Sequence, residues 1–273
     1  MELSAVKLGI IGTGNMGQTI IKGLLANDDR PEIYAYDAAK DSREQVQKRF
    51  STISVVTSNL ELAAQVDIIL LAIKPQVISA VLTEITDNLN PEQLLLSIAA
   101  GIPLKTIEDA TGKRIPAIRI MPNTPALVQK GISALAPGSL TTPEHMELAA
   151  SIFARVGKTV EINETLMDVV TAVSGSGPAY AFLVIEAMID AAVNQGLPRD
   201  TARTLVIETF NGSCALLQET GQQPMALKDM VTSPGGTTIA GLAALEKQGV
   251  RTAFFQAVKA ACDRSRELGK TGK

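Results

Sequence analysis

Short apolar runs rich in β-branched residues recur through the first half of the chain. They lie at 6–11, 33–36, 66–73, 94–98 and 115–120. The run at 66–73 is apolar almost without a break, which is typical of a strand buried on both faces of a parallel sheet. The stretch at 18–26 instead carries apolar residues at helical spacing. This pattern predicts an α/β domain built on a parallel sheet.

The pattern changes after a last strand-like run at 156–162 and is helical to the end of the chain. Helices are predicted at 163–173, 179–195, 200–218 and 251–268, with a Gly- and Ser-rich interruption at 174–178. The helix at 179–195 is apolar nearly all the way round, so we expect it to be buried, for example in a subunit interface. We place the domain boundary near residue 164, which gives an α/β domain of residues 1–163 and an all-α domain of residues 164–273.

A glycine-rich turn follows the first predicted strand at once. The segment Gly12-Thr13-Gly14-Asn15-Met16-Gly17 joins that strand to the helix at 18–26. Strand, glycine turn and helix in this order make up the dinucleotide-binding fingerprint, in which the helix N-terminus holds the pyrophosphate. A purely structural turn is the alternative. The context on both sides favours cofactor binding by all six residues and predicts a Rossmann-type domain.

The second predicted strand ends at Asp37, about twenty residues beyond the last glycine, where the fingerprint places the ribose-binding acid. A carboxylate there accepts hydrogen bonds from the ribose 2′-hydroxyl and repels a 2′-phosphate, which favours NADH. Lys40 and Arg43 follow closely and could hold a phosphate instead. The choice between NADH and NADPH stays open.

Three further predicted strands end in segments suited to a cofactor crevice, because the carboxyl ends of parallel strands meet at the edge where ligands bind. Each segment alone is more often a loop than a site. Their shared position makes candidate cofactor contacts of Ala72, Lys74, Pro75, Ala100 and Asn123.

A second glycine turn lies near the end of the chain, where Ser233-Pro234-Gly235-Gly236-Thr237-Thr238 leads into a helical pattern. Free backbone amides at a helix N-terminus, together with the helix dipole, can capture an anion such as a small acid. The simpler interpretation is an ordinary cap, with Ser233 or Thr237 capping the helix and the glycines only making the turn.

Charge and apolar content narrow the class of protein. The net charge is −3, and no basic stripe with interleaved aromatic residues is present, so nucleic acid is not an expected partner. Charged residues interrupt the most apolar stretches, and the N-terminal residues do not resemble a signal peptide. We therefore expect a cytoplasmic protein that does not enter a membrane.

Few residues are available for acid–base or metal chemistry. The single histidine, His145, lies in the predicted first turn of a helix, and the two cysteines are far apart. No metal site is predicted, and hydrolases or dehydrogenases that need an imidazole are disfavoured. Glu186 and Asp190 could form a catalytic pair, but a structural pairing is the favoured interpretation.

The chain resembles pyrroline-5-carboxylate reductases over nearly its whole length. The resemblance rests on the two glycine turns and, taken in order, on the segments at 72–76, 97–101, 121–125, 174–180 and 228–238. The resemblance implies reduction of 1-pyrroline-5-carboxylate to L-proline by NADPH or NADH, the last step of proline biosynthesis. It also implies that the helical domain is a dimerisation domain, that dimers can build larger rings, and that helices of the partner complete the active site.

The resemblance assigns roles to particular residues. The substrate carboxylate would rest on amides around Gly235, Gly236 and Thr237, and the Thr238 hydroxyl would bond the ring nitrogen as the catalytic contact. Ser233 and Ser176 join the expected substrate contacts, and Asn59 joins the cofactor contacts. A protonated imine needs orientation more than a strong acid or base, which suits a chain with one histidine.

Two other functions remain open at this point. A β-hydroxyacid dehydrogenase has a similar layout but needs a lysine acid–base group early in its helical domain, and no lysine lies between Lys158 and Lys228. A non-catalytic NAD(P)-binding regulator would not need the second anion-binding turn.

Overall fold

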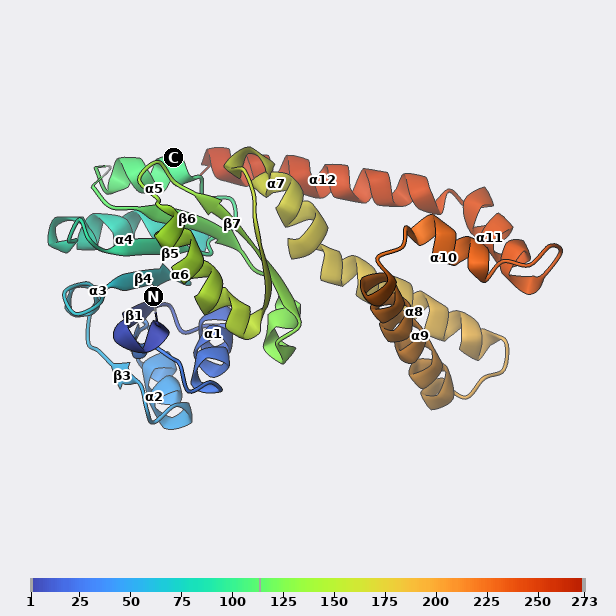
Figure 1. Cartoon of the computed structure of the whole chain (residues 1–273), viewed down its shortest axis with the longest axis horizontal. Coiled ribbons are helices and arrows are strands. Elements are labelled where there is room, and N and C mark those ends of the chain that lie inside the picture. The colour runs from blue at the N-terminus through green and yellow to red at the C-terminus, as the bar shows by residue number, and fades with distance from the viewer. Residues whose placement is uncertain (1, 113, 272–273) are drawn as a thin grey trace. The chain divides into compact units, whose positions relative to one another are not determined.

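The computed structural model describes residues 2–112 and 114–271. The chain separates into two compact units (Figure 1). One comprises Met1–Ser176 with Ala260–Lys273, and the other comprises Gly177–Lys259. The functional ranges expected from the sequence, 1–163 and 164–273, stay a prediction.

The described residues of the first unit form an eight-stranded sheet in the order β3-β2-β1-β4-β5-β6-β7-β8. Its strands are β1 (Lys7–Ile11), β2 (Glu32–Tyr36), β3 (Ser54–Val55), β4 (Ile68–Leu71), β5 (Leu94–Ser97), β6 (Ala117–Met121), β7 (Gly131–Pro137) and β8 (Gly157–Glu161). The first six are parallel, β7 is antiparallel to β6, and β8 is parallel to β7. The strand order reverses between β1 and β4, which is the topological switch point of a doubly wound fold.

Both faces of the sheet are buried under helices. Leu8, Ile10 and Leu70 pack with helices α1 (Asn15–Leu25), α2 (Lys40–Arg49) and α6 (Pro143–Phe153). Ile69 and Leu71 point to the opposite face, which is covered by α3 (Asn59–Ala63), α4 (Ile78–Ile85), α5 (Leu104–Ala110) and α7 (Met167–Val170). Each such side chain contributes about 1.5–3 kcal/mol when fully buried. This two-sided burial explains the unbroken apolar runs and confirms the predicted fold class.

The helical unit contains α8 (Gly177–Asn194), α9 (Arg199–Thr220), α10 (Pro224–Met230), α11 (Thr237–Lys247) and the first part of α12 (Val250–Thr271). The helices predicted at 179–195, 200–218 and 251–268 are confirmed. Helix α10 was not predicted. Pro224 occupies its first turn, where the missing N–H of proline costs nothing.

The Gly- and Ser-rich segment at 174–178 does not break the helix. After a 3₁₀ turn (Glu164–Leu166) and α7, the chain forms a π turn (Thr171–Gly175) and continues into α8. The Ser176 amide donates to the Thr171 carbonyl over 2.8 Å, which closes the wider turn. A Cβ on Gly175 would lie 2.5 Å from Met121 Cε, so the glycine allows close packing rather than a loop.

A partly buried ion pair fastens the start of the helical segment to the sheet. Arg119 of β6 has a side chain only 7% exposed, and its Nη1 lies 3.2 Å from Glu164 Oε1. The same carboxylate oxygen accepts the Leu104 amide at the start of α5 over 2.6 Å. Glu164 therefore neutralises a buried guanidinium and caps a helix.

Glu164→Ala is expected to lower the free energy of unfolding by about 2–3 kcal/mol, because it leaves the Arg119 charge without its partner. This loss of stability is smaller than that expected for a fully buried ion pair, because the Glu164 side chain is 30% exposed. Urea denaturation measures the change. Glu164→Gln keeps an acceptor for Leu104 and should lose less, whereas equal stability of Glu164→Ala and the wild type would contradict the assigned role.

Candidate functional site

The first glycine turn lies between β1 and α1, and its shape requires glycine at two positions. Gly12 has φ +98°, and a Cβ there would lie 2.5 Å from the Ala72 carbonyl oxygen. A Cβ on Gly17 would lie 2.3 Å from the Gly12 carbonyl oxygen. Among the described residues, the amides of Gly14, Asn15 and Met16 have no hydrogen-bond partner. They are donors available to an anion at the N-terminus of α1.

Asp37, at the end of β2, is held against this turn. Its Oδ2 accepts from the Thr13 amide at 2.8 Å and from the Thr13 hydroxyl at 3.2 Å, and its Oδ1 accepts from the Ala39 amide at 3.0 Å. Thr13 is 2% exposed. The Thr13 amide therefore holds the Asp37 carboxylate against the glycine turn.

The two cations that could have held a 2′-phosphate already have partners. Arg43 Nη1 donates to the carbonyls of Asp37 and Ala38 at 2.5 and 3.1 Å, and its guanidinium lies 5.5 Å from the Tyr36 ring centre. Lys40 lies 3.7 Å from Glu44 on the surface of α2. The half-buried Asp37 carboxylate is thus the acceptor group held in a fixed position at the end of β2.

A cavity of about 340 Å³ opens at the carboxyl ends of β1 and β4, at the switch point of the sheet. Its lining comes from the glycine turn, the end of β2, the end of β4 and the faces of α3 and α4. The lining residues are Ile11, Gly12, Gly14, Tyr36, Asp37, Ala38, Asn59, Ala72, Ile73, Lys74, Val77 and Val81. The cavity therefore brings together predicted cofactor contacts from four separate segments.

Asn59 is the buried polar side chain of this cavity. It is 7% exposed, its Nδ2 donates to Glu84 Oε2 over 2.8 Å, and its Oδ1 has no partner. A side-chain N-cap fixes its position at the start of α3, because Ser58 Oγ accepts the Glu61 amide. Glu61 in turn accepts the amide and the hydroxyl of Thr57, the residue before the cap. These bonds from Thr57 hold the pKa of Glu61 below its ordinary value.

The remaining predicted cofactor contacts have other surroundings. Asn123 Oδ1 accepts the Ile132 amide at 3.0 Å and its Nδ2 donates to the Ser174 carbonyl at 3.2 Å, so this amide joins β6, β7 and the π turn. Ala100 precedes Gly101, whose φ is +76°. Pro75 opens a 3₁₀ turn after β4. Within the described chain, none of these three residues lines the 340 Å³ cavity.

The second glycine turn precedes α11. Gly235 has φ +67°, and Gly236 is the N-cap, with φ −79°, ψ 178° and no side-chain cap. The capping role considered for Ser233 or Thr237 is therefore wrong. In the described part of the chain, the amides of Thr237, Thr238 and Ile239 are unpaired.

Two details differ from the sequence-based expectation for this turn. The Gly236 amide donates to the Ser233 carbonyl at 3.1 Å, so it is not free to bind an anion. The free amides begin one residue later, at Thr237. The hydroxyls of Ser233, Thr237, Thr238 and Ser176 have no hydrogen-bond partner among the described residues, and Thr238 is half-buried.

The other candidate residues have structural roles. Asp190 pairs with Arg199 at 2.8 Å, as the favoured interpretation predicted, and both line a cavity of about 280 Å³ together with Glu186. Half-buried His145 forms the capping box of α6, where its Nδ1 accepts the Thr142 amide at 3.2 Å.

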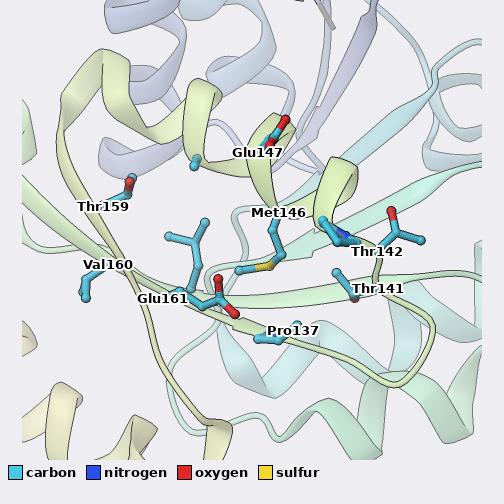
Figure 2. Close-up of a pocket in the computed structure, with 11 residues that line it drawn as sticks. Pro137, Thr141, Thr142, Met146, Glu147, Thr159, Val160 and Glu161 are labelled. Atoms are coloured by element: carbon cyan, nitrogen blue, oxygen red, sulfur yellow. The ribbon is translucent and has the colours of Figure 1, made fainter.

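A larger cavity, of about 490 Å³, lies between α6, β7 and β8 (Figure 2). Met146 extends from α6 toward the strands, and Glu161 lies across from it on β8. None of the predicted site residues lines this cavity.

Comparison with known proteins agrees with this arrangement. Residues 164–268 match the family model for pyrroline-5-carboxylate reductase dimerisation, and residues 7–101 match the model for coenzyme F420-dependent NADP oxidoreductases. A pyrroline-5-carboxylate reductase of Methanosarcina acetivorans is 46% identical over 97% of this chain and 98% of its own length. The Escherichia coli pyrroline-5-carboxylate reductase is 42% identical over 97% of this chain and 99% of its own length.

Solved structures give the same result. The Plasmodium falciparum pyrroline carboxylate reductase with NADP bound has a TM-score of 0.88 at 34% identity and covers 98% of this chain and 99% of its own. The Coxiella burnetii pyrroline-5-carboxylate reductase has a TM-score of 0.90 at 34% identity, with coverages of 96% and 98%. A 3-hydroxyisobutyrate dehydrogenase, at 14% identity and TM-score 0.52, shares the fold alone.

The doubly wound sheet, the glycine turn at its switch point and the helical segment define a nucleotide-dependent oxidoreductase. Within this class, the chain belongs to the pyrroline-5-carboxylate reductase family. The resemblance noted in the sequence is thereby confirmed.

Proposed function

We propose that the protein reduces 1-pyrroline-5-carboxylate to L-proline with NADH or NADPH, the final step of proline biosynthesis. The observation that carries this proposal is the second glycine turn, whose free amides at Thr237 to Ile239 suit a carboxylate. Membership of the family and the glycine turn at the switch point support the nucleotide half of the reaction.

The residues present fit a nicotinamide dinucleotide. The amides of Gly14, Asn15 and Met16 would hold the pyrophosphate, and Asp37 would accept the ribose hydroxyls. The unpaired Asn59 Oδ1 beside them is a buried acceptor that lacks a donor, as expected where a ligand completes the site. When bound, the reduced cofactor supplies the hydride.

The second turn would hold and orient the substrate. Its carboxylate would accept hydrogen bonds from the amides of Thr237 and Thr238, with Ser233 and Ser176 as further hydroxyl contacts. Gly235 gives the turn its left-handed bend. Gly236, which has no side chain, would let the backbone approach the bound acid closely. The protonated ring nitrogen would donate to Thr238 Oγ1. That bond keeps the carbon–nitrogen double bond polarised without any histidine or lysine.

We also propose that residues 1–163 bind the dinucleotide and that residues 164–273 bind substrate and form a homodimer, which can assemble further. The stretch Glu164–Asn194 is long and apolar enough to cross a membrane, yet only 6% of its apolar 18-residue window is buried within the chain. Phe182 and Leu183 of α8 are 64% and 65% exposed. Burial of these side chains against a second copy accounts for the apolar surface in a cytoplasmic protein, and the match to a dimerisation family supports it.

The test follows the absorbance of NADH or NADPH with 1-pyrroline-5-carboxylate and, in a parallel reaction, with 3-hydroxyisobutyrate and the oxidised cofactor. We expect proline formation in the first reaction and no turnover in the second. Turnover of the hydroxy acid alone would replace the proposal by the dehydrogenase alternative. Tight binding of the cofactor without either reaction would favour a regulator.

A further inference from the structure

The orientation of the Asn59 side-chain amide is dictated by its neighbour on α4. Glu84 carries a carboxylate, which can only accept hydrogen bonds, and it lies 2.8 Å from the amide nitrogen of Asn59. An amide turned the other way would place its oxygen against the carboxylate. The Asn59 nitrogen is therefore committed to Glu84, and the oxygen is left as the unpaired atom.

This orientation determines which chemical group the cavity can receive near the end of β2. Asp37 and Asn59 both line the cavity. Each carries a side-chain oxygen that can accept a hydrogen bond, and that of Asn59 is buried and unpaired. A ribose 2′-hydroxyl can donate to such oxygens, whereas a 2′-phosphate presents only acceptors and negative charge. Lys74 is the cation in the lining. If it contacts the pyrophosphate, it serves either cofactor equally, because both carry that group.

We infer that Glu84 is a positioning residue that makes the cofactor site selective for NADH over NADPH, by holding the Asn59 amide with its oxygen free. The inference rests on the proposed cofactor site and adds a residue that does not touch the cofactor. Glu84 is exposed and lies 25 positions along the chain from Asn59. Substitutions at Glu84 should therefore leave the fold intact.

A matched pair of variants separates the hydrogen bond from the charge. Glu84→Gln and Glu84→Met both remove one negative charge, but only glutamine keeps an oxygen that can accept from the Asn59 nitrogen. The probes are NADH and NADPH themselves, titrated against the protein by their fluorescence to give two dissociation constants. Melting temperatures of all variants check that the fold is unchanged.

The wild type is expected to bind NADH more tightly than NADPH. Glu84→Met should reduce that preference about tenfold, mainly through tighter NADPH binding, because the freed amide can turn its N–H groups toward the 2′-phosphate. Glu84→Gln should keep most of the preference. In steady-state kinetics the change should appear in the KM for the cofactor, with kcat at saturation preserved.

The same substitution in an Asn59→Leu background distinguishes positioning from long-range charge. If Glu84 acts through Asn59, Glu84→Met has no further effect on the ratio of the NADPH and NADH dissociation constants once the Asn59 amide is gone. An equal effect in both backgrounds, an unchanged ratio in Glu84→Met, or tighter binding of NADPH by the wild type would each overturn the inference. Because binding is measured directly, a protein that binds both cofactors but does not reduce the imine would fail only the proposed function.

Discussion

Gly14→Ala is expected to weaken NADH binding by about 10- to 100-fold, through the loss of charge-assisted hydrogen bonds to the pyrophosphate, while the protein stays folded. Gly14 has φ −68°, which alanine adopts freely, and a Cβ there has nothing within 4 Å. A methyl group at this position nevertheless projects from the N-cap where the backbone must approach the phosphates. Fluorescence titration with NADH and a thermal melt measure the two quantities.

Gly17→Ala provides the contrasting variant in the same turn. Its Cβ would lie 2.3 Å from the Gly12 carbonyl oxygen, so the turn itself must shift. We expect a loss of about 1–3 kcal/mol of stability together with the loss of binding. If Gly14→Ala bound NADH as well as the wild type does, the amides at the start of α1 would not be the pyrophosphate site.

Most of the nucleotide half could be predicted from the sequence because its signals are local. An apolar run predicts a buried strand, and a glycine turn between a strand and a helix predicts a nucleotide-binding turn. Each signal lies within about ten residues of sequence. Strand β7 was missed for the opposite reason. It lies antiparallel beside β6 and has only one β-branched residue, Ile132, so its pairing partners decide its conformation.

Asp37 and Asn59 were expected to contact the cofactor and do line the cavity, but the sequence did not predict what holds them there. Asp37 was expected beside the ribose, yet its bonds to Thr13 depend on how two separate segments meet. The contact between Asn59 and Glu84 has no local signature at all. The Ser58-x-x-Glu61 pattern is visible in the sequence and could have indicated the start of α3, where Ser58 caps the helix beside Asn59.

The two glycine turns share one backbone geometry, which we propose holds a different anion in each. Each has a glycine with positive φ, then a glycine N-cap in an extended conformation, and then unpaired amides at the start of an 11-residue helix. The two turns differ in the contacts that hold them in place. The first turn is braced by Asp37, whereas a Cβ on Gly235 would meet nothing within 4 Å. We therefore expect the first turn to be preformed for the pyrophosphate, and order in the second to depend on substrate and on the partner subunit.

Thr238→Ala is expected to lower kcat/KM for 1-pyrroline-5-carboxylate about 10- to 100-fold, because one hydrogen bond of about 1–3 kcal/mol to the ring nitrogen is lost. The hydroxyl has no partner among the described residues, so the fold has no need of it. Steady-state kinetics with saturating cofactor measure the effect, and a thermal melt should be unchanged.

Thr237→Ala is the matched control for this prediction, since it removes the neighbouring hydroxyl and keeps both amides. It should change kcat/KM far less, and Thr238→Ser should restore most of the activity, because serine keeps the oxygen that accepts from the ring nitrogen. Equal losses in Thr237→Ala and Thr238→Ala would mean that the effect is not specific to the Thr238 hydroxyl. An unchanged kcat/KM in Thr238→Ala would remove Thr238 from the reaction, and orientation of the imine would then rest on the carboxylate contacts.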